Sequence, residues 1–441
     1  INTLKEKLSM LIYSRRTKYL QKPMIDGSLT LIDTFVYPGY ISKDRYYNGL
    51  WENLSKDERS LTYFVPTFNN IPSYDIIPAY QELRKSDKNF LIKEDYLKFS
   101  DLIFSILHSF RILFLKIKRV SFLGMDISPL IREEILGFNG FRNAVEALLN
   151  FRFAKALKKN RIDIRLVINW FENQALGKGW NAGFSHFHPG IRTIGYRGYV
   201  TSDLYLCTLP SKCENINNIL PQEIAVIGKE LSDPTREFDS TLKTKIVPAF
   251  RFSHLWENHL VISRSKYFTI FFALTHSWDE SKAIIQVLLD NLDFITNNDF
   301  RVIVKPHPTM NIKIVKNLIG SDTSNIIQLV DKSFIDCLSK SNIVISGLSG
   351  AAIESIVLGI PVILLRNHLG ITFNPVPKEI PQGIWNMCDS SDEIIGLIKK
   401  HRSESDEQLQ AYKELGKRVR KNYFEPVTKE NVYNFLGLKL N

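Results

Sequence analysis

Two short motifs in the second half of the chain constrain its fold more than any other feature. The first, Arg301-Val-Ile-Val-Lys-Pro-His-Pro308, is an apolar strand candidate that delivers Lys305 and His307 to its C-terminal end. The second, Ser346-Gly-Leu-Ser-Gly-Ala-Ala-Ile-Glu354, follows another apolar stretch, and its small residues predict a tight turn that opens a helix. Because ligands of open parallel sheets bind outside the carboxyl ends of the strands, both motifs are predicted to lie at one binding edge.

The residue types in the two motifs fit an anionic phosphate. A Ser/Gly turn exposes backbone N–H groups and hydroxyls at a helix N-terminus, where the helix dipole favours an anion. The predicted phosphate-binding residues of this turn are Ser346, Gly347, Ser349 and Gly350. Lys305 and His307 can neutralise a departing phosphate, so the sequence predicts a site for a nucleotide whose phosphate is a leaving group.

Each motif alone has an ordinary structural explanation. Pro-His-Pro can be a rigid turn, and Ser and Gly are common N-cap residues. The order of the elements is more specific: strand, Lys-x-His, helix, strand, Ser/Gly turn, then a helix with Glu354 just over a turn in. Gly359-Ile-Pro361 and a further apolar strand complete a βαβαβ series, which is far less common by chance than any single motif.

Lys305-Pro-His-Pro308, Ser346-Gly-Leu-Ser349 and Glu354-x4-Gly359-Ile-Pro361-Val together resemble GT-B glycosyltransferases of bacterial surface-carbohydrate assembly. More narrowly, the pattern is similar to CMP-sugar-dependent Kdo and sialic acid transferases, and CDP-glycerol and CDP-ribitol polymerases share a similar pattern. The resemblance implies two Rossmann-like domains facing across a cleft. It also implies that His307 contacts the CMP phosphate, that the Ser-rich turn holds that phosphate, and that Glu354 binds the ribose hydroxyls. A CMP-sugar is then the donor substrate, with no metal and no other cofactor.

The alternation of apolar strands and helices along both halves predicts an α/β fold, and 441 residues favour two domains. We expect an N-terminal acceptor-side Rossmann-like domain over residues 1–245 and a nucleotide-sugar-binding Rossmann-like domain over 246–425. Residues 426–441 are expected to form a helix that returns to the first domain. The stretch from Phe99 to Ile117 has helical periodicity with its apolar residues on one side. G-x-G-x-x-G and P-loop motifs are absent, which disfavours a lone Rossmann oxidoreductase and a P-loop enzyme.

Two acids are candidates for the chemistry. Glu172 follows the most apolar strand of the first half, and the aromatic residues around it would raise its pKa toward an acid–base range. Asp279 follows the first strand of the second half and is a candidate nucleophile for a retaining mechanism. Both have structural alternatives: Glu172 could cap the next helix, and Ser277 to Glu280 fits a helix start.

Composition limits the partners and the compartment. The chain has 57 Lys and Arg against 46 Asp and Glu, so its formal net charge is +11. These charges are spread and do not interleave with aromatic residues, which argues against a nucleic-acid partner. The basic stretches 5–22 and 417–421 fit either solvated helix faces or a peripheral contact with an anionic membrane surface. Four cysteines without a CxxC pair favour free thiols and a reducing compartment.

These inferences predict an enzyme that is cytoplasmic and peripheral at the inner membrane. It would move Kdo or a related nonulosonate from a CMP donor to a bacterial surface glycan, either lipopolysaccharide O-antigen or capsule. Its partners would be a nucleotide-sugar donor and a glycan or lipid-linked glycan acceptor. A CDP-polyol phosphotransferase is the alternative in chemistry. A non-catalytic glycan- or lipid-binding module with a relic GT-B fold is the alternative from another class.

Overall fold

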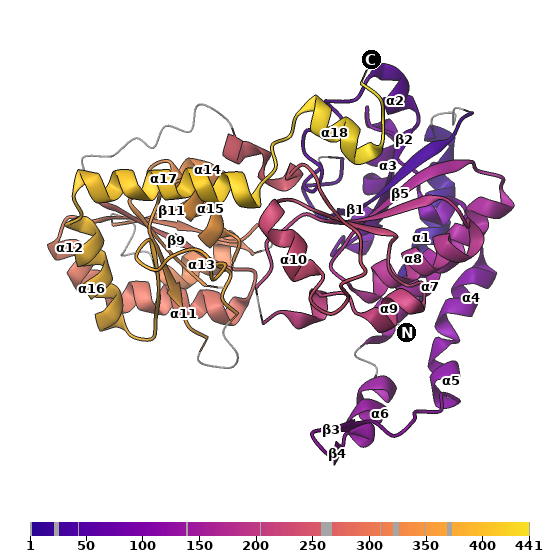
Figure 1. The fold of residues 1–441 in the computed structure, drawn as a ribbon, viewed down its shortest axis with the longest axis horizontal. Coiled ribbons are helices and arrows are strands. Elements are labelled where there is room, and N and C mark those ends of the chain that lie inside the picture. Colours follow the sequence, from indigo (N-terminus) through magenta and orange to yellow (C-terminus); the bar gives the residue numbers. More distant parts are fainter. Residues whose placement is uncertain are drawn as a thin grey trace.

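A computed structural model describes residues 2–21, 26–42, 44–137, 140–202, 204–256, 267–308, 310–320, 326–347, 349–367 and 373–440. Within these ranges the chain forms two parallel sheets of six strands, one in each half (Figure 1). The first has the order β2-β1-β5-β6-β7-β8 and contains β1 (Leu29–Val36), β2 (Thr62–Phe68), β5 (Ile164–Trp170), β6 (Arg192–Arg197), β7 (Glu223–Val226) and β8 (Thr244–Ile246). The second has the order β11-β10-β9-β12-β13-β14 and contains β9 (Thr269–Ala273), β10 (Arg301–Lys305), β11 (Ile327–Leu329), β12 (Ile343–Ser346), β13 (Val362–Leu365) and β14 (Trp385–Cys388). The predicted α/β class with two Rossmann-like domains is confirmed.

Helices accompany both sheets. Those before and between the strands of the first sheet are α1 (Asn2–Thr17), α2 (Lys56–Ser60), α3 (Ile76–Lys85), α4 (Phe99–Ile106), α5 (His108–Leu113), α6 (Ser128–Leu136), α7 (Phe141–Lys159), α8 (Ala175–Phe187), α9 (Lys212–Ile216) and α10 (Ser232–Thr235). The second half contains α11 (Trp278–Asp290), α12 (Leu292–Asn297), α13 (Ile312–Ile319), α14 (Phe334–Leu338), α15 (Ala351–Val357), α16 (Ser391–Arg402), α17 (Asp406–Tyr423) and α18 (Lys429–Leu436). In the described ranges, none of the helices is long and apolar enough to pass through a bilayer.

The central strands of the two large sheets are parallel and buried, so their apolar residues run almost without interruption rather than alternating with polar ones. In β9, for example, all five residues are buried, and β12 is buried throughout. This pattern is expected where helices cover both faces of a parallel sheet. The two motifs follow β10 and β12, so both lie at the carboxyl-terminal edge of the second sheet.

Helices α7 and α8 of the first domain pack so closely against each other that their contact requires a glycine. A Cβ atom on Gly179 would lie 2.0 Å from the carbonyl oxygen of Ala147. The surrounding core includes Phe153, Trp180 and Phe184, each at most 1% exposed. The helix backbones can approach this closely only because position 179 has no side chain.

We expect Gly179→Ala to lower the free energy of unfolding by about 1–3 kcal/mol, because the helices must separate to admit a methyl group. Gly396→Ala is the matched control: it also lies inside a helix, α16, but its Cβ would meet nothing within 4 Å. That variant should gain about 0.5–1 kcal/mol from the lower backbone entropy of the unfolded chain. Urea unfolding of both variants measures the difference, and equal stabilities would contradict the packing described here.

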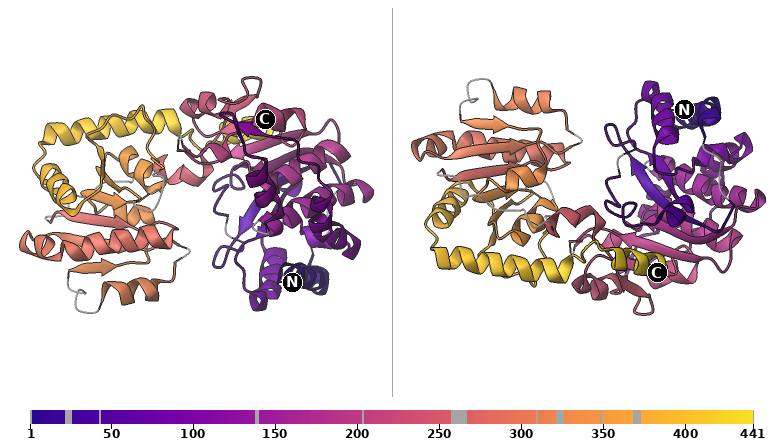
Figure 2. Two further views of the ribbon diagram at one scale, coloured as in Figure 1. Left: turned by 90° about the horizontal axis from the view of Figure 1, so that it is seen from below. Right: turned by 90° about the horizontal axis from the view of Figure 1, so that it is seen from above.

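The end of the chain connects the two domains. Helix α17 lies along the second domain, and the chain then passes to α18 beside the first sheet (Figure 2). In α18 the hydroxyl of Tyr433 donates to Glu58 Oε2 at 2.6 Å, and the ring of Phe435 lies 5.7 Å from those of both Tyr196 and Phe250. The domain limits given above stay a prediction; the limit at residue 245 falls inside β8, which pairs with β7.

Candidate functional site

A pocket of about 670 Å³ lies between the two domains, at the carboxyl ends of β9 and β10. Its wall in the first half includes Tyr40 and Arg45, from the loop that follows β1. Arg251 comes from a short helical segment, η7 (Phe250–Trp256), which packs on the first sheet. The opposite wall belongs to the second domain. The pocket is thus built by residues far apart in the sequence, as expected for a cleft between two Rossmann-like domains.

The Lys-Pro-His-Pro motif reaches this pocket, and Lys305 and His307 both line it. Lys305 is the last residue of β10, so the end of the strand sets its direction. Burial, reinforced by the positive charges of Arg45, Arg251 and Lys305 and by neighbouring His276, lowers the pKa of His307 to about 4. The imidazole is therefore neutral at neutral pH, and a bound anion would change this by balancing the surrounding charge.

The Ser/Gly motif reaches the pocket only in part. Ser349 and Gly350 line it, and Ser349 Oγ accepts a hydrogen bond from the Ala351 amide at 3.2 Å. Ser346 is fully buried and donates through Oγ to the Ala273 carbonyl at 3.1 Å, so its hydroxyl ties β12 to β9. Gly347 does not line the pocket either. Its Cβ would lie 3.1 Å from Glu280 Oε2, so the absence of a side chain serves close packing.

Glu354, in the first turn of α15, also lines the pocket and has a partner in η7, which packs on the first sheet. Its Oε2 lies 2.9 Å from Nε2 of His254 in η7. The Glu354 side chain is 15% exposed and that of His254 is 28% exposed, so the contact is partly shielded from water. His254 therefore fixes the direction of the Glu354 carboxylate.

Two of the four cations of the pocket, Arg45 and Lys332, were not identified from the sequence, which also leaves Arg251 undecided between pairing with a carboxylate and ordinary loop packing. Arg45, Arg251 and Lys332 line the pocket together with Lys305, against two acids, Asp331 and Glu354. Lys332 follows the end of β11. Because ligands of open parallel sheets bind outside the carboxyl ends of the strands, its position in the sequence could have identified it. The placement of Arg45 and Arg251 depends on how the two domains face each other, which a linear pattern does not encode.

Glu172 lies outside the lining of this pocket, on the loop after β5. Its two carboxylate oxygens accept hydrogen bonds from Trp170 Nε1 and from Gln174 Nε2, each at 2.7 Å. Burial, with smaller contributions from Cys207 and Glu172, raises the pKa of Tyr205. The Tyr205 ring lies 5.5 Å from that of Phe373 in the second domain. Glu172 is therefore near a point where the two domains meet.

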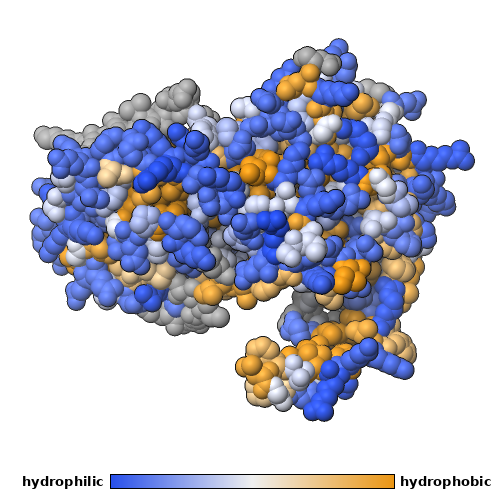
Figure 3. All heavy atoms as spheres, viewed as in Figure 1, coloured by the Kyte–Doolittle hydropathy of each residue, from blue (hydrophilic) through white to orange (hydrophobic). Residues whose placement is uncertain are grey.

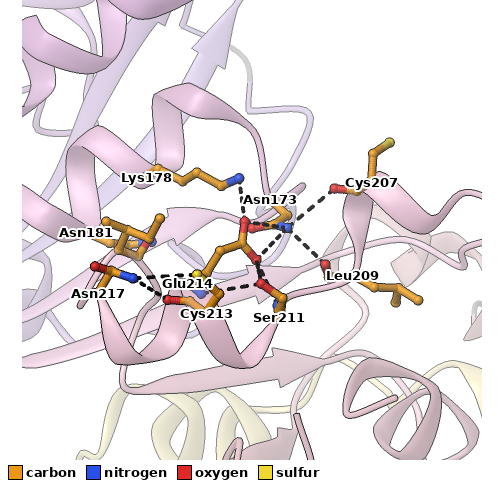
Figure 4. Close-up of polar contacts among 10 residues, drawn as sticks. Asn173, Lys178, Asn181, Cys207, Leu209, Ser211, Cys213, Glu214 and Asn217 are labelled. Atoms are coloured by element: carbon orange, nitrogen blue, oxygen red, sulfur yellow. Dashed lines mark hydrogen bonds and ion pairs between the residues drawn. The ribbon is translucent and has the colours of Figure 1, made fainter. Parts of the chain in front are cut away.

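A polar network around Asn173 holds this loop in place (Figure 4). Asn173 has φ of +54°, a left-handed conformation that asparagine tolerates better than most residues. Its Nδ2 donates to the Leu209 carbonyl at 3.0 Å and also reaches the carboxylate of Glu214. Glu214 in turn forms an ion pair with Lys178 at 2.5 Å. The residue next to Glu172 is thus anchored, which fixes the position of the Glu172 backbone.

Asp279 occupies the first turn of α11, and the structure does not bring it to the pocket. Its side chain is 71% exposed and lies 3.9 Å from Lys282 Nζ. The same turn has Ser277 as N-cap, with its hydroxyl accepting from the Glu280 amide at 3.4 Å. An acid at this position stabilises the positive end of the helix dipole. The helix-start explanation therefore accounts for the residue without a catalytic role.

Comparisons with known proteins place the fold in the GT-B class. No protein-family model and no curated protein sequence matches the chain. Among solved structures, a UDP-GlcNAc 2-epimerase from Neisseria meningitidis bound to UDP-GlcNAc has a TM-score of 0.53 at 11% identity, over 93% of this chain and 98% of that one. The S. aureus MnaA–UDP complex has a TM-score of 0.53 at 10% identity, over 94% and 98%. A glycosyltransferase of kitacinnamycin has a TM-score of 0.51 at 10% identity, over 94% and 100%. The chain has a GT-B fold.

Proposed function

We propose that this chain is a nucleotide-sugar-dependent glycosyltransferase. Its donor would be a CMP-activated 2-keto sugar acid, Kdo or a related nonulosonate, and its acceptor a bacterial surface glycan such as lipopolysaccharide O-antigen or capsule. The observation that carries the proposal is the pocket between the domains, whose lining contains four cations together with His307. Such a pocket suits a ligand with two anionic groups, and a CMP-linked sugar acid has a phosphate and a carboxylate.

In this proposal, different residues of the pocket bind different parts of the donor. Lys305, His307 and the Ser349–Gly350 turn hold the phosphate, and Glu354 accepts hydrogen bonds from the ribose hydroxyls. The guanidinium groups of Arg45 and Arg251 are suited to the sugar carboxylate, because arginine matches planar carboxylates with two parallel hydrogen bonds. Ser346 and Gly347 support the turn from behind rather than touching the donor.

The chemistry requires a leaving phosphate and a proton acceptor. The acceptor hydroxyl attacks the anomeric carbon, the bond from that carbon to the phosphate oxygen breaks, and CMP leaves with the bonding electrons. Cations around the phosphate stabilise the charge that develops on it. Glu172 is proposed as the base that takes the proton from the acceptor hydroxyl. Asp279 has no part in this scheme.

A UDP-sugar is the second candidate donor, because two proteins of the same fold are bound to UDP or UDP-GlcNAc. A CDP-polyol is the third. Equilibrium titration of the protein with CMP, CDP and UDP distinguishes them, because a CMP donor needs one phosphate subsite and a diphosphate needs two. We expect CMP to bind at least tenfold more tightly than UDP. A preference for UDP would replace the proposed donor with a UDP-sugar, and a preference for CDP would favour the polyol phosphate.

CMP binding should tighten as the pH falls. A phosphate beside His307 favours the protonated ring and so raises its pKa above the value of about 4 in the free protein. At pH values between the His307 pKa of the free protein and that of the complex, binding of CMP is accompanied by uptake of a proton. In this range the affinity for CMP increases by up to about tenfold for each unit by which the pH falls. Above both values His307 contributes no pH dependence. His307→Gln is the control, because it leaves only the ionisation of the ligand; an identical pH profile for the two proteins would exclude the linkage.

The acceptor and the location are proposed from the same chemistry. A surface glycan grows on a lipid or lipid-linked carrier, so we propose that the enzyme works in the cytoplasm at the inner membrane. Domain closure over the pocket would exclude water from an activated donor.

A further inference from the structure

An arm formed by residues 99–137 extends from the first domain (Figure 1). It consists of α4, α5, a hairpin of β3 (Ser121–Phe122) and β4 (Met125–Asp126), and α6. Only its base belongs to the core: Leu102 is fully buried, and Asp101 forms an ion pair with Arg152 of α7 at 2.6 Å. From Ile106 to Gly137, a stretch described without a gap, no residue is buried.

The arm nevertheless exposes large apolar side chains. The periodic stretch from Phe99 to Ile117 is not one helix: α4 ends at Ile106 and α5 at Leu113. Beyond Ile106 the apolar side of this stretch faces solvent, and Figure 3 shows hydrophobic residues gathered on the arm. Those with more than half of their surface exposed are Phe99, Phe110, Leu113, Phe114, Leu115, Phe122, Leu123, Met125 and Leu130. A contiguous apolar surface of this kind marks an interaction site in a soluble protein.

The tip of the hairpin is the clearest part of this surface. Leu123 is 83% exposed and has φ of +50°, followed by Gly124 with φ of +82°. Two-residue hairpin turns with positive φ favour Asn-Gly or Asp-Gly, so a leucine here is unfavourable for the fold both in conformation and in hydration. Leu123 therefore does not stabilise the isolated protein, which indicates that its side chain contacts a binding partner.

The positive charge of the arm indicates which kind of partner its apolar surface binds. The segment before the hairpin, Arg111-Ile-Leu-Phe-Leu-Lys-Ile-Lys-Arg119, interleaves four cations with apolar residues and contains no acid. Arg119 contacts Asp126 at 3.3 Å, while Lys116 and Lys118 are exposed. A second copy of the chain meeting this face would bring cations against cations. An anionic bilayer offers hydrocarbon for the apolar side chains and negative headgroups for the cations.

We propose that this arm docks on an anionic lipid bilayer, with the Phe122–Met125 hairpin tip inserted among the lipids and Lys116 and Lys118 at the headgroups. The binding surface is then a built feature of the first domain and is separate from the basic stretch 417–421 on α17.

Co-sedimentation of the full chain with vesicles tests the proposal, using phosphatidylcholine alone or mixed with about one third phosphatidylglycerol. The tip variant is Phe122→Ser with Leu123→Asn; asparagine suits the positive φ, so folding is retained. We expect it to bind mixed vesicles at least tenfold more weakly. The charge variant is Lys116→Ser with Lys118→Ser, and should lose about tenfold on mixed vesicles and little on neutral ones.

The matched control is Lys417→Ser with Lys421→Ser, which removes the same charge from an exposed face of α17 and should bind mixed vesicles like the unaltered chain. Wild-type binding by both arm variants would overturn the proposal, and so would equal losses in the control. Sedimentation velocity without lipid adds a further check. A dimer that the tip variant dissociates, together with no vesicle binding, would show that the arm joins two copies instead.

Discussion

We expect His307→Ala to lower kcat by about 10²–10³-fold while the protein remains folded, because the variant removes a hydrogen-bonding group from the leaving phosphate. Burial, reinforced by the surrounding cations, lowers the pKa of His307 to about 4, so the ring is neutral at neutral pH. In the protein without ligand, the His307 ring is therefore a neutral hydrogen-bonding group and not a fixed positive charge. Turnover of radiolabelled donor, together with the unfolding profile, measures both parts of the expectation.

Two variants make this test specific. His307→Gln retains a neutral donor of similar reach and should recover part of the lost turnover. His276→Ala removes a histidine ring that lies 6.2 Å from His307 but does not line the pocket, and should change kcat by less than about threefold. Full turnover by a folded His307→Ala variant would contradict the proposed role. Turnover absent from the unaltered chain with every donor tested would favour the non-catalytic binding module instead.

The sequence predicted the second domain well because its signals are local. An apolar strand, a polar residue at its end and a small-residue turn are all written within a few positions, and Lys305, His307, Ser349, Gly350 and Glu354 line one pocket as a result. Ser346 shows the limit of the same argument. A serine at the end of a buried strand can turn into the sheet or into the pocket, and its bond to Ala273 is formed across two strands.

The opposite wall of the pocket could not be derived in this way. Arg45 and Arg251 line the same pocket as Lys305 only because the two domains face each other across the cleft. The arm illustrates the same difficulty in another form. Helical periodicity in residues 99–117 indicates an apolar side correctly, but it does not say whether that side meets a protein core or something outside the protein.

Glu172→Gln should lower kcat by about 10²-fold with CMP affinity little changed, because the amide keeps the size and hydrogen bonding of the carboxylate but cannot take a proton. The structure fits this division of labour in two respects. Glu172 lies outside the pocket that is proposed for the donor, and it is near the contact of Tyr205 with Phe373, where the domains meet. Its neighbour Asn173 is anchored to Leu209, so the loop has one defined position.

The comparison that decides the role of Glu172 separates kcat from nucleotide binding. Glu237→Gln removes an exposed carboxylate from the same domain and should leave both quantities unchanged. If Glu172→Gln weakens CMP binding and leaves kcat intact, Glu172 belongs to the donor pocket. The proposed assignment of the donor to the second domain and the acceptor to the first is then wrong. If both quantities stay at the level of the control, the carboxylate serves only to join Trp170 and Gln174, and the base is another group. A loss in kcat alone is the result expected of an acid that acts on the acceptor, because the donor is held by the opposite domain.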